Sequence, residues 1–199
     1  VHLLGDGTYR ERIGEFEFQV GPSCFFQPNP AQAENLFRVV EEFARLDPEC
    51  SVVYDLFCGV GAIGLFLAPR VRRVVGIESH PESIRFAWIN AELNRASNCT
   101  FQVGDASEAL QEEFLQAHGV PDTVVLDPPR AGLHPRLSAR LLEVNPMRIV
   151  YTSCNPATQA RDLAVLKEKY EVESIQPVDM FPQTDHIETV IALKRPNDA

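Results

Sequence analysis

The chain has 199 residues, of which 45% are hydrophobic and 23% are charged, a composition typical of one packed globular domain rather than of a disordered or coiled-coil chain. Its 18 basic and 28 acidic residues give a formal net charge of −10, which argues against non-specific binding of nucleic acid or of an anionic membrane by the chain as a whole. No apolar run is long enough to span a bilayer, and the first residues lack the pattern of a signal peptide.

The N-terminal part predicts a strand pair followed by a helix. Apolar residues alternate between residues 8 and 20, which is typical of a strand or hairpin. Asn29 followed by Pro30 is the pattern of a helix N-cap and first turn, and apolar residues between 36 and 46 follow at helical spacing. Residues 1–28 form a separate segment in this interpretation, and we expect it to be the remnant of a truncated upstream region.

From residue 51 onward, short apolar strands alternate with helices. Strands are predicted over 51–57, 73–78, 99–105, 122–129 and 147–154, helices over the stretch that begins at 63 and over 81–94, 106–117, 137–144 and 158–169, and two final strands over 170–178 and 187–194. Five strand–helix units predict a mostly parallel sheet with helices on both faces. The last two strands have no helix between them, so they predict a C-terminal antiparallel hairpin. Residues 29–199 are therefore expected to form one α/β domain with a seven-stranded sheet.

A glycine loop after the first of these strands predicts a nucleotide-type cofactor. Residues 59–64 match G-x-G-x-x-G, which permits a tight turn and a close approach of the backbone to a ligand. Glu78 follows Gly59 at the distance expected of an acid that binds both ribose hydroxyls. This fits either a dinucleotide or S-adenosylmethionine. Asp55, just before the loop, would repel a pyrophosphate, and Asp127 begins a stiff Asp-Pro-Pro turn that faces the same edge; both favour the methyl donor.

Two further residues could carry chemistry. Cys154 comes just after the fifth strand, where a thiol could act as a nucleophile. Glu188 begins the last strand, where it could face the cleft as a general base. On position alone, a structural role is the simpler interpretation of each. The five cysteines show no metal-ligand spacing, so no metal is predicted, and their odd number without a secretory signal favours a reducing, cytoplasmic compartment.

The charge is unevenly distributed. Between residues 130 and 161 five arginines stand against one acid, Glu143, so this window carries +4 in a chain of −10. Such a window favours a local contact with a polyanion. The simpler interpretation is that these arginines lie on solvated helix faces.

Five segments together resemble the RNA uracil-C5 methyltransferase family. They are residues 25–29 (FFQPN), 55–61 (DLFCGVG), 127–132 (DPPRAG), 150–158 (VYTSCNPAT) and 179–188 (DMFPQTDHIE), in the order and spacing of that family. The resemblance implies a Rossmann-like class I methyltransferase fold, with Cys154 as nucleophile and Glu188 as base. It also implies a site for S-adenosylmethionine, and for its product S-adenosylhomocysteine, lined by Gln27, Phe57, Gly59, Glu78, Asp105 and Asp127.

The chemistry of this family explains these residue types. The C5 atom of uracil is a poor nucleophile until a thiolate, implied here to be that of Cys154, adds to C6. After methylation C5 still carries a proton, which a carboxylate such as Glu188 removes. The target base must leave its stack, so the implied partner is RNA with an accessible uridine, and the 179–188 loop leans toward ribosomal over transfer RNA. Arg130 would contact either a phosphate or a uracil carbonyl.

The sequence departs from this family in two respects. Members usually carry an N-terminal RNA-binding domain, and some hold an iron–sulfur cluster, but neither is visible in this sequence. We therefore expect the chain to hold the cofactor pocket and to bind RNA weakly. In addition, Ala62 stands where some relatives have Asn.

Three alternatives remain open on the sequence. A methyltransferase acting on an amino group of adenine or cytosine would place an aromatic residue after Asp-Pro-Pro, where this chain has Arg130. The glycine spacing allows an NAD-dependent oxidoreductase. The basic window allows a noncatalytic RNA-binding module with the same fold, although the presence of both Cys154 and Glu188 counts against it.

Overall fold

The computed structural model describes residues 7–49 and 51–196, and the described part begins with a small hairpin and a helix. The hairpin is β1 (Tyr9–Ile13) and β2 (Phe16–Val20), and the helix is α1 (Pro30–Ala44). Successive side chains of β2 point to opposite faces of the hairpin, so Phe16 and Phe18 are buried on the same face. Asn29 caps α1, because its side chain accepts a hydrogen bond from the Gln32 N–H at 3.3 Å.

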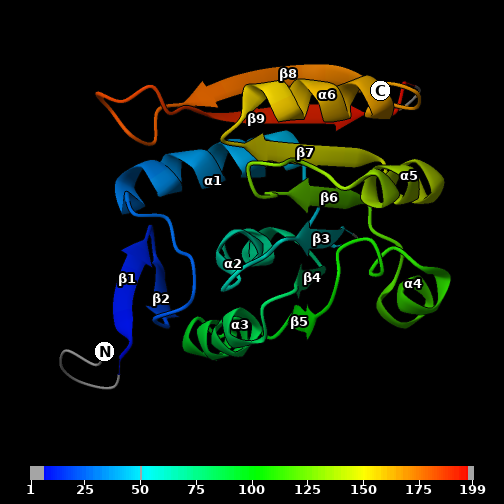
Figure 1. The fold of residues 1–199 in the computed structure, drawn as a ribbon. Coiled ribbons are helices and arrows are strands. Elements are labelled where there is room, and N and C mark those ends of the chain that lie inside the picture. Colours follow the sequence, from blue (N-terminus) through cyan, green and yellow to red (C-terminus); the bar gives the residue numbers. More distant parts are fainter. Residues whose placement is uncertain (1–6, 50, 197–199) are drawn as a thin grey trace.

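The main sheet has seven strands in the order β5-β4-β3-β6-β7-β9-β8 (Figure 1). Its strands are β3 (Val52–Leu56), β4 (Arg73–Glu78), β5 (Cys99–Val103), β6 (Thr123–Leu126), β7 (Arg148–Ser153), β8 (Glu171–Val178) and β9 (Glu188–Lys194). The first five are parallel, whereas β9 runs antiparallel to both β7 and β8. The predicted mostly parallel sheet with a C-terminal hairpin is therefore confirmed.

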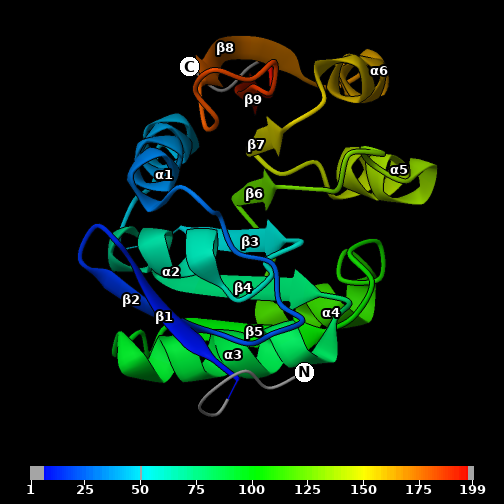
Figure 2. The same ribbon diagram turned by 60° about the vertical axis from the view of Figure 1, so that its left-hand side comes forward.

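Helices cover both faces of the sheet, as Figure 2 shows. After α1 they are α2 (Ala62–Leu67), a short 3-10 turn (Ala68–Arg70), α3 (Pro81–Leu93), α4 (Glu112–His118), α5 (Pro135–Val144) and α6 (Pro156–Leu166). Helices α1, α2 and α3 lie on one face, and α4, α5 and α6 on the other. Each face has its own apolar core, one built around Val53, Phe37 and Phe86 and the other around Tyr54 and Tyr151. Among the described helices none has the length and apolar character needed to cross a bilayer.

The predicted helix over 106–117 is wrong in its first half. Residues 106–110 form turns, and α4 begins only at Glu112. The Asp105 carboxylate accepts a hydrogen bond from the Ser107 N–H at 2.8 Å, which holds the chain in a turn where the pattern alone indicated a helix.

The described part of the predicted N-terminal segment packs on the α/β domain. The Asn94 side chain accepts from the Glu17 N–H at 3.0 Å, and the Asn90 side chain accepts from the Gln19 N–H at 2.7 Å. Asn90 lies in the last turn of α3 and Asn94 is its C-cap, so β2 is held against that helix by side-chain to backbone bonds. The division of the chain at residue 28, and its origin in a longer protein, stay predictions.

Gly76→Ala tests the packing between β4 and β5. A Cβ at this position would lie 2.4 Å from the Phe101 ring, so we expect a loss of about 1–3 kcal/mol in the free energy of unfolding. Gly104→Ala is the control, because the nearest atom to its Cβ would be a methyl group of Ile77 at 3.9 Å. Urea denaturation measures both variants, and equal midpoints for the two would contradict the packing described.

Candidate active site

A cleft of about 590 Å³ opens at the edge of the sheet where the parallel strands end. It brings together all of the predicted site residues except Asp105. Its lining consists of Ser23, Phe25, Gln27, Phe57, Gly59, Glu78, Ser79, His80, Ser83, Asp127, Pro128, Pro129, Arg130, Cys154 and Glu188. The carboxyl ends of parallel strands form the usual ligand site of such sheets, and the chain gathers its polar side chains there.

The glycine loop forms the floor of the cleft. The N–H groups of Phe57 and Cys58 both donate to the Ile77 carbonyl, at 2.9 and 3.0 Å, which turns the chain sharply after β3. Phe57 itself has φ +71°, a left-handed conformation that is costly for a residue with a side chain. The Glu78 carboxylate accepts from the Gly59 N–H at 3.3 Å and from the His80 N–H at 2.9 Å, so it is held at the end of β4.

Asp55 forms the buried wall behind this loop. The carboxyl group is fully buried, and one of its oxygens accepts from the Gly64 N–H at 2.8 Å, whereas the other has no hydrogen-bond partner among the described residues. Burial raises the pKa of Asp55 to about 7, against the effect of the Gly64 bond, and the charges of Asp127 and Glu78 raise it further. Asp55 lines a narrow extension of the cleft together with Gln27.

Cys154 and Glu188 come together through the pairing of β7 with β9. Ser153 pairs with Thr189 in this antiparallel ladder, so the next residue in each direction brings the thiol and the carboxyl to adjacent strands at one end of the ladder. Both side chains line the cleft. The predicted convergence of these two residues is therefore what the structure shows, although their chemical roles stay predictions.

The charges around the thiol shift its pKa in both directions. Burial raises the pKa of Cys154, the Glu188 carboxylate beside it raises it further, and the Arg130 guanidinium lowers it. Burial also raises the pKa of Glu188 to about 7, with a contribution from the charge of Asp127. The pKa of Asp127 is raised to about 7 by burial as well. Two carboxyls that change protonation near neutral pH thus stand beside a thiol, which suits proton transfer.

Asp105 is the predicted site residue that the structure places elsewhere. It lines a neighbouring hollow with His134 and Arg136, outside the cleft. Hydrogen bonds from the Ser107 side chain and backbone lower the pKa of the Asp105 carboxyl. The sequence put Asp105 at the end of a strand predicted over 99–105, whereas β5 ends at Val103 and Asp105 follows it by two residues. The direction of its side chain depends on the turn that follows.

Sequence reasoning missed several cleft residues. Ser23, Ser79, His80 and Ser83 line the cleft but were not singled out. The position of His80, two residues after a strand that ends at Glu78, was a signal that could have found it. Ser83 was harder to predict, because it enters the lining from the first turn of α3.

The basic window does not form a continuous basic surface. Arg148 is buried and pairs with Glu173 at 2.5 Å, and it donates to the Phe43 carbonyl at 3.2 Å. Arg140 pairs with Glu143 and Arg161 with Asp162. In the described part of the chain, Arg130 and Arg136 are the members of the window without an ion pair.

The chain is similar to known proteins of one family. A model of the tRNA (uracil-5-)-methyltransferase family matches residues 12–196. The chain belongs to this family. A relative from Bacteroides thetaiotaomicron, named as an uncharacterized RNA methyltransferase, is 48% identical over 195 residues, which are 98% of this chain and 43% of the relative. An uncharacterized RNA methyltransferase from Clostridium acetobutylicum is 43% identical over 98% of this chain and 42% of its own length. This family member thus spans less than half the length of these relatives.

Solved methyltransferase structures have the same fold as this chain. One similar structure is that of the Pyrococcus abyssi tRNA (uracil-54, C5)-methyltransferase in complex with S-adenosyl-L-homocysteine. It superposes with a TM-score of 0.83 at 40% sequence identity, and the match covers 96% of this chain and 45% of the Pyrococcus abyssi chain. The tRNA m1G37 methyltransferase of M. jannaschii superposes with a TM-score of 0.71 at 14% identity, over 100% of this chain and 60% of its own, which bears on the fold alone. The predicted Rossmann-like methyltransferase fold is confirmed.

Asp55→Asn tests the buried carboxyl. The pKa of Asp55 lies above its ordinary value of 3.8, so the folded chain holds a proton that the unfolded chain releases. The contribution of Asp55 to the free energy of unfolding is therefore fully present below about pH 4. It is lost as the pH rises to about 7, and the free energy of unfolding falls by roughly 2–4 kcal/mol over this range. The variant cannot titrate there, so its free energy of unfolding is expected to fall less between about pH 5 and pH 8 than that of the wild type.

The measurement is urea denaturation at both pH values. Asp179→Asn, an exposed loop position, is the control and is expected to keep the wild-type slope. If the free energy of unfolding of Asp55→Asn fell with pH as steeply as that of the wild type, Asp55 would be ionised over the whole range from about pH 5 to pH 8, contrary to the burial described.

Proposed function

We propose that this chain is the catalytic part of an enzyme that transfers a methyl group from S-adenosylmethionine to C5 of a uridine in RNA. The observation that carries the proposal is that Cys154 and Glu188, from two adjacent strands, line one cleft with the glycine loop and Glu78. Membership of the tRNA (uracil-5-)-methyltransferase family supports the same chemistry. The complex of the Pyrococcus abyssi enzyme with S-adenosyl-L-homocysteine supports the cofactor.

The residues of the cleft fit S-adenosylmethionine. When bound, this cofactor supplies an electrophilic methyl group on a positively charged sulfur. The Glu78 carboxylate at the end of β4 would bind ribose hydroxyls, as acids at this position do in related folds. Asp55 and Asp127 line the inner wall with pKa values of about 7, so they are partly ionised at neutral pH, and the positive sulfonium and ammonium groups would favour their ionised forms. Gln27 and Phe57 complete this end of the cleft, whereas the assignment of Asp105 to the cofactor stays a prediction.

Cys154 would start the reaction on the uracil ring. Its sulfur forms a bond to C6, and the electron pair of the C5–C6 double bond moves into an enolate that makes C5 nucleophilic. C5 would then form a bond to the methyl group while the bond from that methyl to the sulfonium sulfur breaks, so that the electron pair stays on sulfur and S-adenosylhomocysteine is released. Burial and Glu188 raise the pKa of Cys154, so the thiol would release its proton to solvent before the sulfur adds to C6, and the nearby Arg130 charge favours the thiolate.

Glu188 would finish the reaction. It takes the remaining proton from C5, the electron pair re-forms the C5–C6 double bond, and the bond from C6 to the Cys154 sulfur breaks. With a pKa of about 7, the Glu188 carboxyl is partly ionised at neutral pH and can both accept this proton and release it afterwards. The proposed base begins β9, which pairs with the strand that ends just before the proposed nucleophile.

Two finer points concern the RNA. The family description and the Pyrococcus abyssi neighbour favour a transfer RNA substrate, against the lean of the 179–188 loop toward ribosomal RNA. Mapping 5-methyluridine in the two RNA fractions, with and without the gene, decides between them.

The chain carries a net charge of −10 and has no continuous basic face in its 130–161 window, so we propose that the remainder of the longer protein supplies most of the RNA affinity.

Cys154→Ala tests the nucleophile. RNA that contains 5-fluorouracil has no C5 proton to lose, so the full-length wild-type enzyme with S-adenosylmethionine is expected to accumulate a covalent adduct that survives denaturing electrophoresis. Cys154→Ala is expected to form none. Cys24→Ala removes another partly exposed thiol and is expected to form the adduct normally. Adduct formation by Cys154→Ala would refute the assignment.

Glu188→Gln tests the base with ordinary RNA. An amide cannot take the C5 proton, so methylated RNA is expected to stay attached to Cys154, and turnover is expected to fall by about 100-fold or more. Mass spectrometry of the trapped complex measures the mass of the attached nucleotide. Release of 5-methyluridine at the wild-type rate would show that another group acts as the base.

A further inference from the structure

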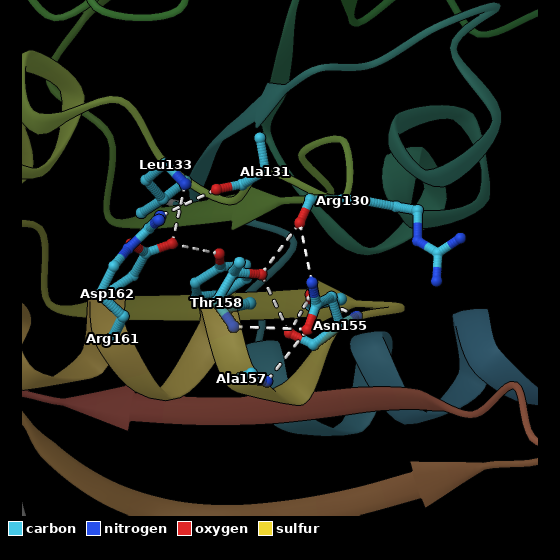
Figure 3. A network of polar contacts seen from close by, with 10 residues as sticks. Arg130, Ala131, Leu133, Asn155, Ala157, Thr158, Arg161 and Asp162 are labelled. Atoms are coloured by element: carbon cyan, nitrogen blue, oxygen red, sulfur yellow. Dashed lines mark hydrogen bonds and ion pairs between the residues drawn. The ribbon is translucent and has the colours of Figure 1, made fainter.

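The loop over residues 130–133, which follows the Asp-Pro-Pro turn, is tied to the start of α6. The Arg130 carbonyl accepts a hydrogen bond from the Asn155 side-chain amide at 3.1 Å (Figure 3). The Thr158 hydroxyl also lies 3.1 Å from this carbonyl, and at the same distance from the Asn155 carbonyl, so it shares one proton between the two. The backbone of Arg130 is therefore fixed by the first turn of the helix that begins two residues after Cys154.

The far end of the loop is held by a buried carboxylate. One oxygen of Asp162 accepts from the Leu133 N–H and from the Tyr151 hydroxyl, both at 2.7 Å. Its other oxygen receives the Arg161 guanidinium, at 2.7 and 3.0 Å, and Arg161 also donates to the Ala131 carbonyl at 2.9 Å. Asp162 is thus bonded to the loop, to β7 and to its own helix neighbour at once.

The loop is pressed closely onto α6. Gly132 has φ +77°, and a Cβ there would lie 2.4 Å from the Asp162 carboxylate and 3.2 Å from the Thr158 side chain. Only glycine fits this position without displacing the loop. The hydrogen bonds and this contact leave the backbone of the loop little freedom relative to Cys154.

The backbone of Arg130 is fixed, whereas its side chain forms no ion pair with any residue that the structure describes. In Figure 3 the Arg130 guanidinium extends away from the network, and the same side chain lines the cleft with Cys154. We propose that Thr158 and Asp162 are positioning residues for the thiol chemistry: they hold the 130–133 loop on α6 so that the Arg130 charge stays beside Cys154. This inference rests on the proposed function, in which Cys154 is the nucleophile.

The electrostatics of the thiol support this arrangement. The charged groups that act on Cys154 are Glu188 from β9, and Asp127 and Arg130 from the segment after β6. The two carboxylates raise the pKa of Cys154, and Arg130 opposes them. A loop that moves Arg130 away from the thiol leaves the carboxylates unopposed, so the thiolate becomes rarer at a given pH.

The test is the rate at which iodoacetamide alkylates Cys154, followed by peptide mass spectrometry across the neutral to alkaline range. Thr158→Val keeps the shape of the side chain but removes the hydroxyl, and it is expected to slow alkylation at pH 8 by about threefold, as the loss of one exposed charge partner would. Thr158→Ser keeps the hydroxyl and is expected to react at the wild-type rate. An unchanged rate in Thr158→Val, or an equal loss in Thr158→Ser, would overturn the proposal.

Arg130→Gln shows whether the effect passes through the charge. This variant is expected to slow alkylation by itself, and adding Thr158→Val to it is expected to change nothing further, because the two substitutions act on one interaction. If Thr158→Val slows alkylation as much in the Arg130→Gln background, the hydroxyl acts only on the local structure and the proposal fails.

Gly132→Ala tests the Asp162 side of the loop without removing the buried carboxylate. It is expected to slow alkylation as Thr158→Val does, and a wild-type rate would count against Asp162 as a positioning residue. The alkylation experiments use neither RNA nor cofactor, whereas the 5-fluorouracil adduct tests the proposed function itself. Failure of the positioning proposal is therefore distinguishable from failure of the proposed methyltransferase function.

Discussion

The antiparallel pairing of β9 with β7 is the constraint on which the site depends. It brings Glu188, from near the end of the chain, beside Cys154, from the end of the last parallel strand. The five parallel strands alone would place their carboxyl ends, with Asp55, Glu78 and Asp127, at one edge of the sheet. Only a strand that runs the opposite way can bring its first residue to that edge, and this is what the C-terminal hairpin does.

Burial then determines the chemistry of that edge. Asp55 and Glu188 are buried and Asp127 is partly buried, and the charge of Asp127 acts on both of the others, so the ionised forms are disfavoured and each pKa is raised to about 7. Such a cluster is unfavourable for stability at neutral pH, and it is the kind of arrangement that functional sites retain. Its position beside Cys154 gives the cleft carboxyl groups that can exchange protons and a wall that attracts positive charge.

Most of the fold could be predicted because its signals are local. Apolar strands that alternate with helices, and the two last strands without a helix between them, were enough to predict the parallel sheet and the hairpin. The helix over 106–117 was predicted too long, because the Asp105 side chain accepts a hydrogen bond from the Ser107 N–H, which competes with the helical pattern. The arginines between 130 and 161 were grouped by sequence, but Arg148 is buried against Glu173. A linear count of charge cannot show such pairing.

The sequence by itself determined the order of the elements, the glycine loop and the residue types at the strand ends, because periodicity and turn chemistry act over a few residues. Its resemblance to the family predicted Cys154 and Glu188 as the reactive pair, a prediction of their roles that the Cys154→Ala and Glu188→Gln variants test. Only the tertiary structure decided which of these residues share a cleft, why Asp105 does not, and how the 130–133 loop is tied to α6. These features depend on strand pairing and on side-chain direction, which are set by contacts between residues far apart in the chain.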